Sequence, residues 1–260
     1  LVPLAGALVG DASELGADTV RRFTRQLREL ALDPDEYRFL PVHPWQWRRK
    51  LAITFAPDVA RRHLVLLGEA GDEHRPQQSI RTYFNVSRPE RHYVKTALAI
   101  QNMGFLRGLS PAYMRATPAI NDWVADLVEA DPELQAYGFG VLRELATIGW
   151  TGDVFHALPE PSPYRKMVAA LWRESPVPRL AAGERAATMA ALLHRDAQGA
   201  GYATALVRAS GLDPERWVRR YLDAYLRPLV HCLLRHDLAF MPHGENLIMV
   251  LRDHVPVRML

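Results

Sequence analysis

Two neighbouring stretches of alternating side chains, residues 78–87 and 92–100, constrain the fold of this chain more than any other feature. Residues 88–91 connect them and include a proline, so the connection is a short loop. Two strand patterns joined in this way predict an antiparallel hairpin. Alternation places Val94 on one face of the second strand and Lys95 on the other. The chain is therefore expected to contain an antiparallel sheet that carries a cation on one of its strands.

The rest of the chain combines helical periodicity with short apolar runs. The clearest helix start is Asp213-Pro214-Glu215, which offers an N-cap, a proline at the first helical position and an acid in the first turn. Other helices are expected over residues 20–30, from Ser110 onward, over 162–172 and over 186–194, and other strands over 64–67, 247–251 and 255–260. Together these elements predict an α+β fold, with a β-rich first part, a helix-rich second part and a terminal hairpin.

Composition indicates a globular protein suited to anionic ligands. The 260 residues are 48% hydrophobic, which is enough for one large domain or two smaller ones. No run reaches the ~18–20 apolar residues of a membrane span, and no signal-peptide pattern is visible. The net charge of +3 arises from intermixed basic and acidic residues, and this mixture argues against a nucleic-acid-binding surface.

The single cysteine and the two chain ends each lead to a further prediction. Cys232 is the only cysteine, so no disulfide can form within the chain, which favours a reducing cytoplasm. Its apolar neighbours predict that it is buried. The chain begins at Leu1 and ends at Leu260 within a strand-like stretch. Both ends look cut, and we therefore expect a fragment of a longer protein.

The first candidate site combines two hydroxyls with three cations. Ser79, Arg81 and Thr82 lie on or beside the first strand of the predicted hairpin, Lys95 lies on the second, and Arg107 follows soon after. An arginine offers forked donors to phosphate oxygens and a lysine offers a compact charge, so the set suits a phosphate group. The alternative is a solvated strand face with ordinary surface cations.

Two other segments are rich in polar side chains. In the first, His243, Glu245 and Asn246 lie between a long helix and an apolar strand, and their side chains suit a phosphate and a hard cation such as Mg²⁺. The alternative is a plain polar turn. In the second, His43 and Trp45 lie in a proline-containing loop, for which the alternative is a rigid connection with Trp45 as a core anchor.

Several common catalytic motifs are missing. The chain has no GxxxxGK[ST] loop, no GxSxG elbow, no HExxH and no protein-kinase motif set. Gly138-Phe139-Gly140 lacks the rest of a dinucleotide fingerprint. His231 and His236 are five positions apart, not four, and are therefore not expected to form a two-histidine zinc face.

The polar segments, taken together and in this order, resemble the IucA/IucC family of siderophore synthetases, which work without a nonribosomal peptide synthetase. The motifs are His43-Pro44-Trp45-Gln46, Ser79-Ile80-Arg81-Thr82, Lys95 with Arg107, and His243-Gly244-Glu245-Asn246. The segments 93–98, 102–109, 116–123 and 162–167 look like those of the desferrioxamine synthetases within that family. The resemblance covers essentially the whole chain. It implies a cupped-hand fold, with a partial fingers region over residues 1–160 and a partial FhuF-like palm region over residues 161–260.

The resemblance also implies roles for individual residues. Those implied to hold ATP are Ser79, Arg81, Thr82, Lys95, Arg107, His243, Asn246 and His43. Among them, Arg107, His243 and Lys95 are the expected catalytic residues, and Asn246 with Glu245 is expected to hold Mg²⁺. The chain departs from the family at two positions, where Met241 and Glu245 replace a common glutamate and glutamine. Glu245 is therefore a candidate for the carboxylate that Met241 cannot supply.

The implied reaction joins a carboxylate to an amine through an acyl adenylate and releases AMP. The implied substrate is N-hydroxy-N-succinylcadaverine, which would be oligomerised and cyclised to desferrioxamine by a homodimer. No nucleic acid and no membrane is expected as a partner. Three alternatives remain open: a synthetase of the same family for another carboxylate such as citrate, a phosphotransferase that releases ADP, and a non-catalytic protein that binds a nucleotide or a siderophore.

Overall fold

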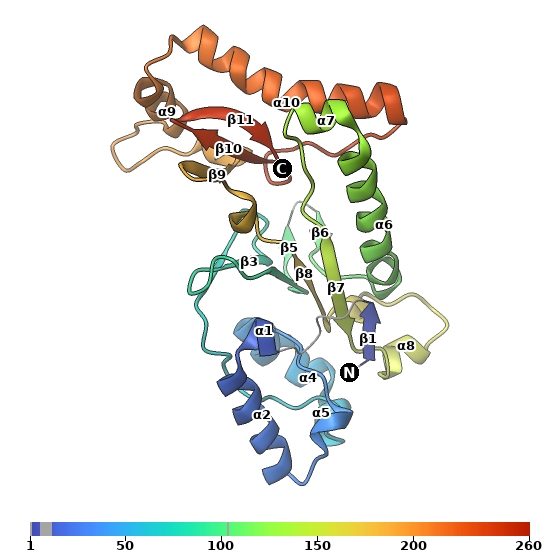
Figure 1. The fold of residues 1–260 in the computed structure, drawn as a ribbon. Coiled ribbons are helices and arrows are strands. Elements are labelled where there is room, and N and C mark those ends of the chain that lie inside the picture. Colours follow the sequence, from blue (N-terminus) through green and yellow to red (C-terminus); the bar gives the residue numbers. More distant parts are fainter. Residues whose placement is uncertain (1, 6–11, 103) are drawn as a thin grey trace. The chain divides into compact units, whose positions relative to one another are not determined.

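The computed structural model describes residues 2–5, 12–102 and 104–260, which form two compact units (Figure 1). The first unit is Leu1–Asn121 with Arg143–Glu174, and the second is Asp122–Leu142 with Ser175–Leu260. Each unit has its own sheet, its own helices and its own core, in agreement with the α+β class. The assignment of residues 1–160 and 161–260 to two family regions stays a prediction.

A six-stranded antiparallel sheet forms the centre of the first unit. In spatial order its strands are β1 (Val2–Ala5), β7 (Glu144–Gly149), β8 (Ala169–Arg173), β4 (Tyr93–Thr96), β3 (Thr82–Asn85) and β2 (His74–Pro76). A separate ribbon pairs β5 (Gln101–Asn102) with β6 (Phe105–Leu106). The predicted hairpin is confirmed, because Thr82 lies opposite Lys95 and Tyr83 lies opposite Val94.

The central strand β8 replaces a helix that was expected over residues 162–172. Pro163–Lys166 form only one 3₁₀ turn, and the apolar residues after it enter the sheet. Leu171 packs on one face beside Met114, while Trp172 packs on the other face beside Ile148. A strand that is covered on both faces carries a continuous apolar run, which periodicity does not distinguish from a buried helix. The helix prediction is therefore wrong here.

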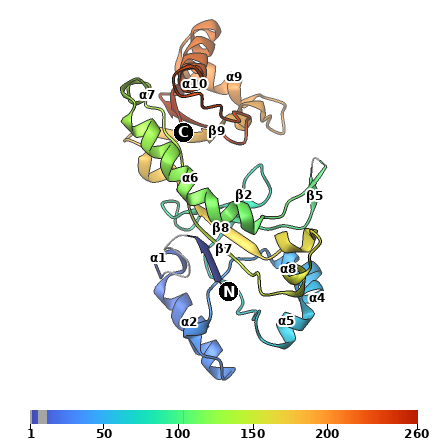
Figure 2. The same ribbon diagram turned by 90° about the vertical axis from the view of Figure 1, so that its right-hand side faces the viewer.

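The helix α6 (Pro111–Ala130) provides part of this cover. Its first turns lie beside β7 and β8 (Figure 2), and the hydroxyl of Thr147 on β7 donates to the backbone carbonyl of Met114 at 3.1 Å. The remaining helices of the first unit are α1 (Ala12–Leu15), α2 (Ala17–Glu29), α3 (Pro44–Gln46), α4 (Ala52–Thr54), α5 (Ala56–Ala60) and α8 (Val154–Ala157). In α2 the periodic residues Phe23 and Leu27 are buried, as predicted.

Two other predicted elements of the chain have a different structure. Residues 64–67 form no strand, because the Leu64 amide donates to the Asp58 carbonyl of α5 at 3.3 Å and Leu66 is exposed. Residues 186–194 are divided between strand β9 (Glu184–Thr188) and a 3₁₀ turn (Met189–Leu193). Both predictions are wrong because short apolar runs do not specify whether a sheet edge is available to pair with.

The second unit contains the antiparallel sheet β11 (Val255–Met259), β10 (Ile248–Arg252) and β9, together with α7 (Pro132–Ala136), α9 (Tyr202–Ser210) and α10 (Pro214–His236). The terminal hairpin and the start of α10 are confirmed, since the Asp213 carboxylate accepts from the Arg216 amide at 3.0 Å. Cys232 is fully buried against this sheet. Among the described residues, no helix is both long and apolar enough to cross a bilayer.

The His92–Glu14 ion pair predicts a pH dependence of stability. His92 Nδ1 lies 2.6 Å from Glu14 Oε1, and this hydrogen bond, followed by the charges of Glu14 and Glu174, raises the pKa of His92 against the effect of burial. A raised pKa means that the stabilisation is complete below the ordinary histidine pKa of about 6.5 and is lost as the pH rises through the folded-state value. We expect the difference in unfolding free energy between wild type and His92→Gln to shrink as the pH is raised from about 6 to 9.

Urea denaturation at a series of pH values measures this difference. His194→Gln, at an exposed position, is the matched control and should show no such trend. A constant difference for His92→Gln across the whole range would contradict the assigned role of the ion pair.

Candidate functional site

Strand β4 brings three cationic side chains together. Lys95 lies on the strand itself. The amide of Thr96 donates to the carbonyl of Arg81 at 2.9 Å, and the amide of Leu98 donates to the carbonyl of Arg107 at 3.0 Å. The backbone of both arginines is therefore fixed by the same stretch of chain that carries the lysine. The charges of Arg81 and Arg107 interact, and Arg81 and Lys95 both interact with Glu144. The joint role of the three cations in binding phosphate stays a prediction.

One carboxylate accompanies these cations. Lys95 Nζ lies 3.1 Å from Glu144 Oε1, and Glu144 lies opposite the partly buried Arg173 across strands β7 and β8. Sequence reasoning named neither Glu144 nor Arg173, because the region that follows Ser110 was expected to be helical. No simple alternation marks this strand, because a bulge separates Glu144 from Ala146 and the residues after it are buried on both faces.

The positive charge of Arg81 and Arg107 is not fully balanced by the negative charge nearby. Burial, followed by the positive charge of Arg107, lowers the pKa of the Arg81 guanidinium, while Glu144 acts in the opposite direction. Arg81 Nη1 donates to the Gly108 carbonyl at 2.5 Å, and Arg107 Nη2 donates to Asn102 Oδ1 at 3.3 Å. Both of these acceptors are neutral. An anion in this place would relieve the mutual repulsion of the two guanidinium groups.

Two buried polar atoms of the predicted site make no hydrogen bond within the described part of the chain. They are Ser79 Oγ and Arg107 Nε. A buried donor or acceptor without a partner costs about 1–3 kcal/mol, so most such groups are paired in folded proteins. Ligand oxygens are suitable partners for both a hydroxyl and a guanidinium N–H. A bound anion would therefore give both atoms a hydrogen-bond partner, and the same anion would balance the positive charge of the two arginines.

Ser79 and Arg81 lie in a turn and not on a strand face, which corrects the expected strand over residues 78–87. The Ile80 amide donates to the Gln77 carbonyl at 2.9 Å, and β3 begins only at Thr82, which is buried. Ile80 has a φ of 54°, a left-handed conformation that is rare for a β-branched residue. Such strain costs on the order of 1–3 kcal/mol and is concentrated at functional sites. The strained turn is a third sign of function at this position.

His43 lies next to the same strand. Its Nδ1 accepts from the Trp45 amide at 3.1 Å, and its ring centroid lies 6.0 Å from that of Tyr83 on β3. Trp45 is 36% exposed, so the interpretation of this tryptophan as a core anchor is wrong. The anchor is Gln46, which is fully buried, donates to the Met167 carbonyl at 3.2 Å and accepts from the Ala99 amide at 2.8 Å.

The second unit holds the other predicted segment as a tight turn. His243, Glu245 and Asn246 are all exposed. The Asn246 amide donates to the His243 carbonyl at 2.9 Å, and Asn246 Nδ2 donates to the Met241 carbonyl at 3.0 Å. The turn thus presents a carboxylate and an amide on a backbone that is fixed by hydrogen bonds. Oxygen donors of this kind suit a hard cation such as Mg²⁺.

His231 and His236 are brought together in spite of their five-residue spacing. Their Nε2 atoms lie 2.9 Å and 2.7 Å from the same atom, Asp131 Oδ2. Five residues correspond to about 140° around a helix, so the two rings approach the carboxylate from different sides. The two histidines therefore share a carboxylate, which their spacing in the sequence did not predict. The missing information was the position of Asp131, 100 residues from His231 in the sequence.

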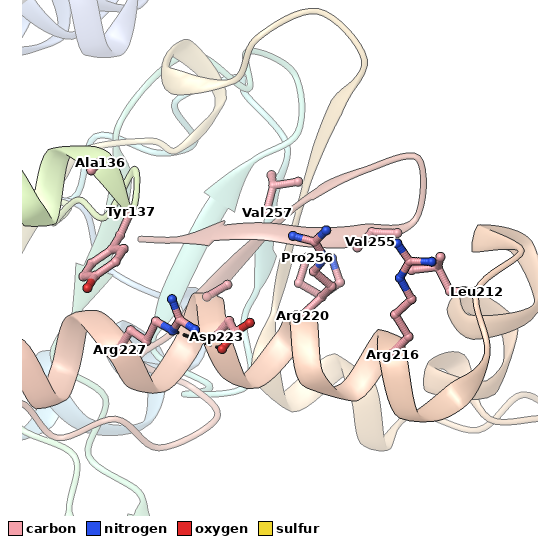
Figure 3. Close-up of a pocket in the computed structure, with 11 residues that line it drawn as sticks. Ala136, Tyr137, Leu212, Arg216, Arg220, Asp223, Arg227, Val255, Pro256 and Val257 are labelled. Atoms are coloured by element: carbon pink, nitrogen blue, oxygen red, sulfur yellow. Dashed lines mark ion pairs between the residues drawn. The ribbon is translucent and has the colours of Figure 1, made fainter.

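A pocket of about 450 Å³ lies between α10 and β11 in the second unit (Figure 3). Arg216, Arg220 and Arg227 line one wall, and Arg227 forms an ion pair with Asp223 at 3.1 Å. None of the residues predicted to bind ATP or Mg²⁺ lines this pocket. It is therefore distinct from the predicted nucleotide-binding residues.

Comparisons with known proteins match two family descriptions to the chain. The description "IucA / IucC family" matches residues 9–194, and "Ferric iron reductase FhuF-like transporter" matches residues 215–260. A putrebactin synthase from Shewanella sp. (strain MR-4) is 51% identical over 95% of this chain and 39% of its own length. An aerobactin synthase from Vibrio mimicus is 39% identical over 83% of this chain and 37% of its own length. The chain thus spans about two fifths of these curated relatives.

A solved structure shows the same fold. The petrobactin biosynthesis protein AsbB from Bacillus anthracis str. Sterne superposes with a TM-score of 0.84 at 30% identity. The match covers 95% of this chain and 40% of that protein. The mixed sheet-and-helix architecture of the two units is therefore that of a known biosynthetic enzyme.

Gly108, whose carbonyl accepts from Arg81, packs closely against the backbone of Lys166. A Cβ atom at position 108 would lie 2.5 Å from Lys166 Cβ and 2.7 Å from the Lys166 carbonyl oxygen. Gly108→Ala is therefore expected to lower the unfolding free energy by roughly 1–3 kcal/mol, the usual cost of overpacking. Gly201→Ala is the control, because its Cβ would meet only Thr204 Oγ1 at 3.5 Å. Urea denaturation of both variants checks this, and equal stabilities would contradict it.

Proposed function

The chain belongs to the IucA/IucC family, and from that premise we propose that it is part of an ATP-dependent siderophore synthetase that joins a carboxylate to an amine. The observation that carries the proposal is the partly buried cation cluster at β4, where Arg81, Lys95 and Arg107 are accompanied by the carboxylate of Glu144. A polyanion such as a triphosphate is the ligand that this excess of charge suits best.

The proposed reaction solves a specific chemical problem. A carboxylate resists an amine because its negative charge repels the nucleophile and oxide is a poor leaving group. In the first step a carboxylate oxygen attacks the α-phosphorus of ATP, the bond to the β-phosphate breaks, and pyrophosphate leaves. In the second step the amine attacks the acyl carbon of the adenylate, and the bond to AMP breaks. The amine proton is lost, and the products are an amide, AMP and pyrophosphate.

The cation cluster has a defined role in this sequence. Negative charge develops on the α-phosphate in the first step, and preorganised cations stabilise that transition state. We assign this role to Arg107, and we assign the departing pyrophosphate to Arg81 and Lys95. The resemblance to the family adds His243 of the second unit as a further phosphate-binding residue. Ser79, Thr82 and His43 complete the binding of ATP, the two hydroxyls as hydrogen-bond donors to phosphate oxygens.

Mg²⁺ is the metal that the proposal includes. The exposed turn of the second unit offers the Glu245 carboxylate and the Asn246 amide oxygen, and hard oxygen donors of this type fit the ion. Glu245 would take the place of the carboxylate that Met241 cannot provide. When bound, Mg²⁺ would neutralise part of the triphosphate charge.

We propose N-hydroxy-N-succinylcadaverine as the substrate, with desferrioxamine as the product. This molecule has a carboxylate at one end and an amine at the other, so repeated condensation yields oligomers and then a ring. The relatives named putrebactin synthase and aerobactin synthase support a siderophore precursor as the substrate class. The finer assignment rests on the segments 93–98 and 102–109. A different carboxylate, such as citrate, is the competing assignment within the family.

The reaction products distinguish these possibilities. The complete protein is incubated with ATP, Mg²⁺ and N-hydroxy-N-succinylcadaverine, and nucleotides and products are read by mass spectrometry. We expect AMP, pyrophosphate and amide-linked oligomers. A substrate with one methylene fewer in its diamine should have a lower kcat/KM, by roughly 10-fold or more if the chain length is read in an apolar pocket. Turnover with citrate alone would change the substrate, ADP would indicate a phosphotransferase, and binding without turnover would leave only a binding role.

Arg107 is the residue whose replacement tests the mechanism most directly. Arg107→Ala in the complete protein is expected to lower kcat by about 10²–10³, the usual loss when one preorganised charge-stabilising group is removed. Arg115→Ala is the matched control, because Arg115 is exposed on α6 and the same charge is removed there. Steady-state release of pyrophosphate measures both. Normal turnover of Arg107→Ala would overturn the assignment of Arg107 to the transition state.

A further inference from the structure

A second group of ligand-type side chains lies in the second unit, apart from the residues assigned to ATP. It consists of Asp131 before α7 and of His231 and His236 in the last turns of α10. Asp131 Oδ2 lies 2.9 Å from His231 Nε2 and 2.7 Å from His236 Nε2. The ligand atoms of the three residues all lie within 4.8 Å of one another. Two imidazole nitrogens therefore face the same carboxylate oxygen.

The other oxygen of Asp131 is already in use. Oδ1 accepts from the amides of Glu133 at 2.8 Å and of Leu134 at 3.0 Å, so Asp131 is the N-cap of α7. These bonds fix the direction in which Oδ2 points. Oδ2 is therefore the oxygen that remains for the two imidazoles, and its direction is set by the backbone.

The side chains around His231 favour a positive charge on or next to its imidazole ring. Its Nδ1 lies 3.1 Å from Glu133 Oε2 while its Nε2 faces Asp131, so both ring nitrogens face acceptor oxygens. A neutral imidazole has only one N–H and satisfies only one of them. If Nδ1–H donates to Glu133, the lone pair on Nε2 points at an anionic oxygen. Either an additional proton or a metal ion between Nε2 and Asp131 Oδ2 resolves this conflict.

The pattern around His231 is the one that surrounds metal-bound histidines. Such histidines commonly donate their second ring N–H to a carboxylate, which fixes the ring and strengthens the ligand. Here Glu133 is that carboxylate, and the Tyr137 hydroxyl donates in turn to Glu133 Oε1. The chain of contacts thus extends from Tyr137 through Glu133 and His231 to Asp131.

We propose that Asp131, His231 and His236 form a binding site for a divalent transition-metal ion of the Zn²⁺ type, with Glu133 as the carboxylate that positions His231. Two imidazoles and one carboxylate are a ligand set that Zn²⁺ and Co²⁺ accept, and they leave a coordination position for water. With bonds of about 2.0–2.1 Å the ligand atoms lie roughly 3.3 Å apart. The two histidine–aspartate separations are 2.7 Å and 2.9 Å, and all three ligand atoms lie within 4.8 Å of one another, so side-chain movements are sufficient to bind the ion. The ion would link the start of α7 to the end of α10.

Co²⁺ titration of the complete protein tests the proposal. The protein is stripped with a chelator, returned to buffer with excess Mg²⁺ to saturate sites for hard cations, and titrated with Co²⁺. We expect one equivalent to give the visible d–d absorption of nitrogen- and oxygen-bound Co²⁺, and Zn²⁺ to displace it. His236→Gln keeps an amide donor for Asp131 but removes the ligand, so this variant should fold and lose the absorption. His194→Gln, an exposed histidine, is the control and should keep it.

Two more variants change the metal ligands or their support while α7 stays folded. Asp131→Asn keeps a good N-cap for α7 but replaces the anionic ligand, so we expect weaker binding with α7 intact. Glu133→Gln should weaken Co²⁺ binding by about 10–100-fold without changing the stoichiometry, as removal of an outer carboxylate usually does. A readout independent of activity is the rise in Tm with Zn²⁺, which should be present in wild type and absent in His236→Gln.

Three outcomes would overturn the proposal. The first is no Co²⁺ absorption in the wild type. The second is an absorption that His231→Gln and His236→Gln leave unchanged, because the metal would then be bound elsewhere. The third is a Tm of the wild type that is the same with and without Zn²⁺. In that case a proton on His231, and not a metal ion, would be the cation between the imidazole and Asp131.

Discussion

Strand β4 is the element on which the candidate nucleotide site depends. It is paired on both sides, with β3 and with β8, and it carries Lys95. The amides of Thr96 and Leu98 also hold the carbonyls of Arg81 and Arg107. Backbone hydrogen bonds of a central strand do not adjust easily, so Lys95 lies on a rigid part of the sheet, and the turn and the loop that carry Arg81 and Arg107 are tied to the end of β4 and to the residues just after it. This arrangement is the preorganisation that charge stabilisation requires.

The same sheet explains how residues 43–46 are placed next to these cations. They were predicted to form a loop, but His43 is the N-cap of helix α3. Gln46 is fully buried, and its amide bridges the backbone of Ala99 after β4 and that of Met167 before β8. A buried amide is stabilising only when its hydrogen bonds are made, so this helix has one favourable position relative to the two strands. His43 is consequently held beside Tyr83 on β3. A single satisfied polar side chain therefore links the first polar segment of the sequence to the second.

The sequence allowed prediction of features that local chemistry determines. The hairpin follows from alternation around a short loop, and the start of α10 follows from its N-cap and proline. The strand β8 and the turn at Ile80 were not predictable in this way, because burial on both faces and a strained φ are imposed by tertiary packing. For the site, the cations were found from residue type and spacing. Glu144, Arg173 and Asp131 were missed because only the folded chain brings them to their partners.

The cation cluster is an arrangement that the protein would not keep for stability alone. Two guanidinium groups repel each other, Arg107 Nε and Ser79 Oγ are buried without a partner among the described residues, and Ile80 holds a strained conformation beside them. Each of these features costs free energy, and together they amount to a large part of the margin by which a domain of this size is stable. Residues that bind a charged substrate commonly have this unfavourable environment before the ligand is present. A polyanion would remove the repulsion and satisfy the unpartnered atoms in one step, so the ligand and the fold stabilise each other.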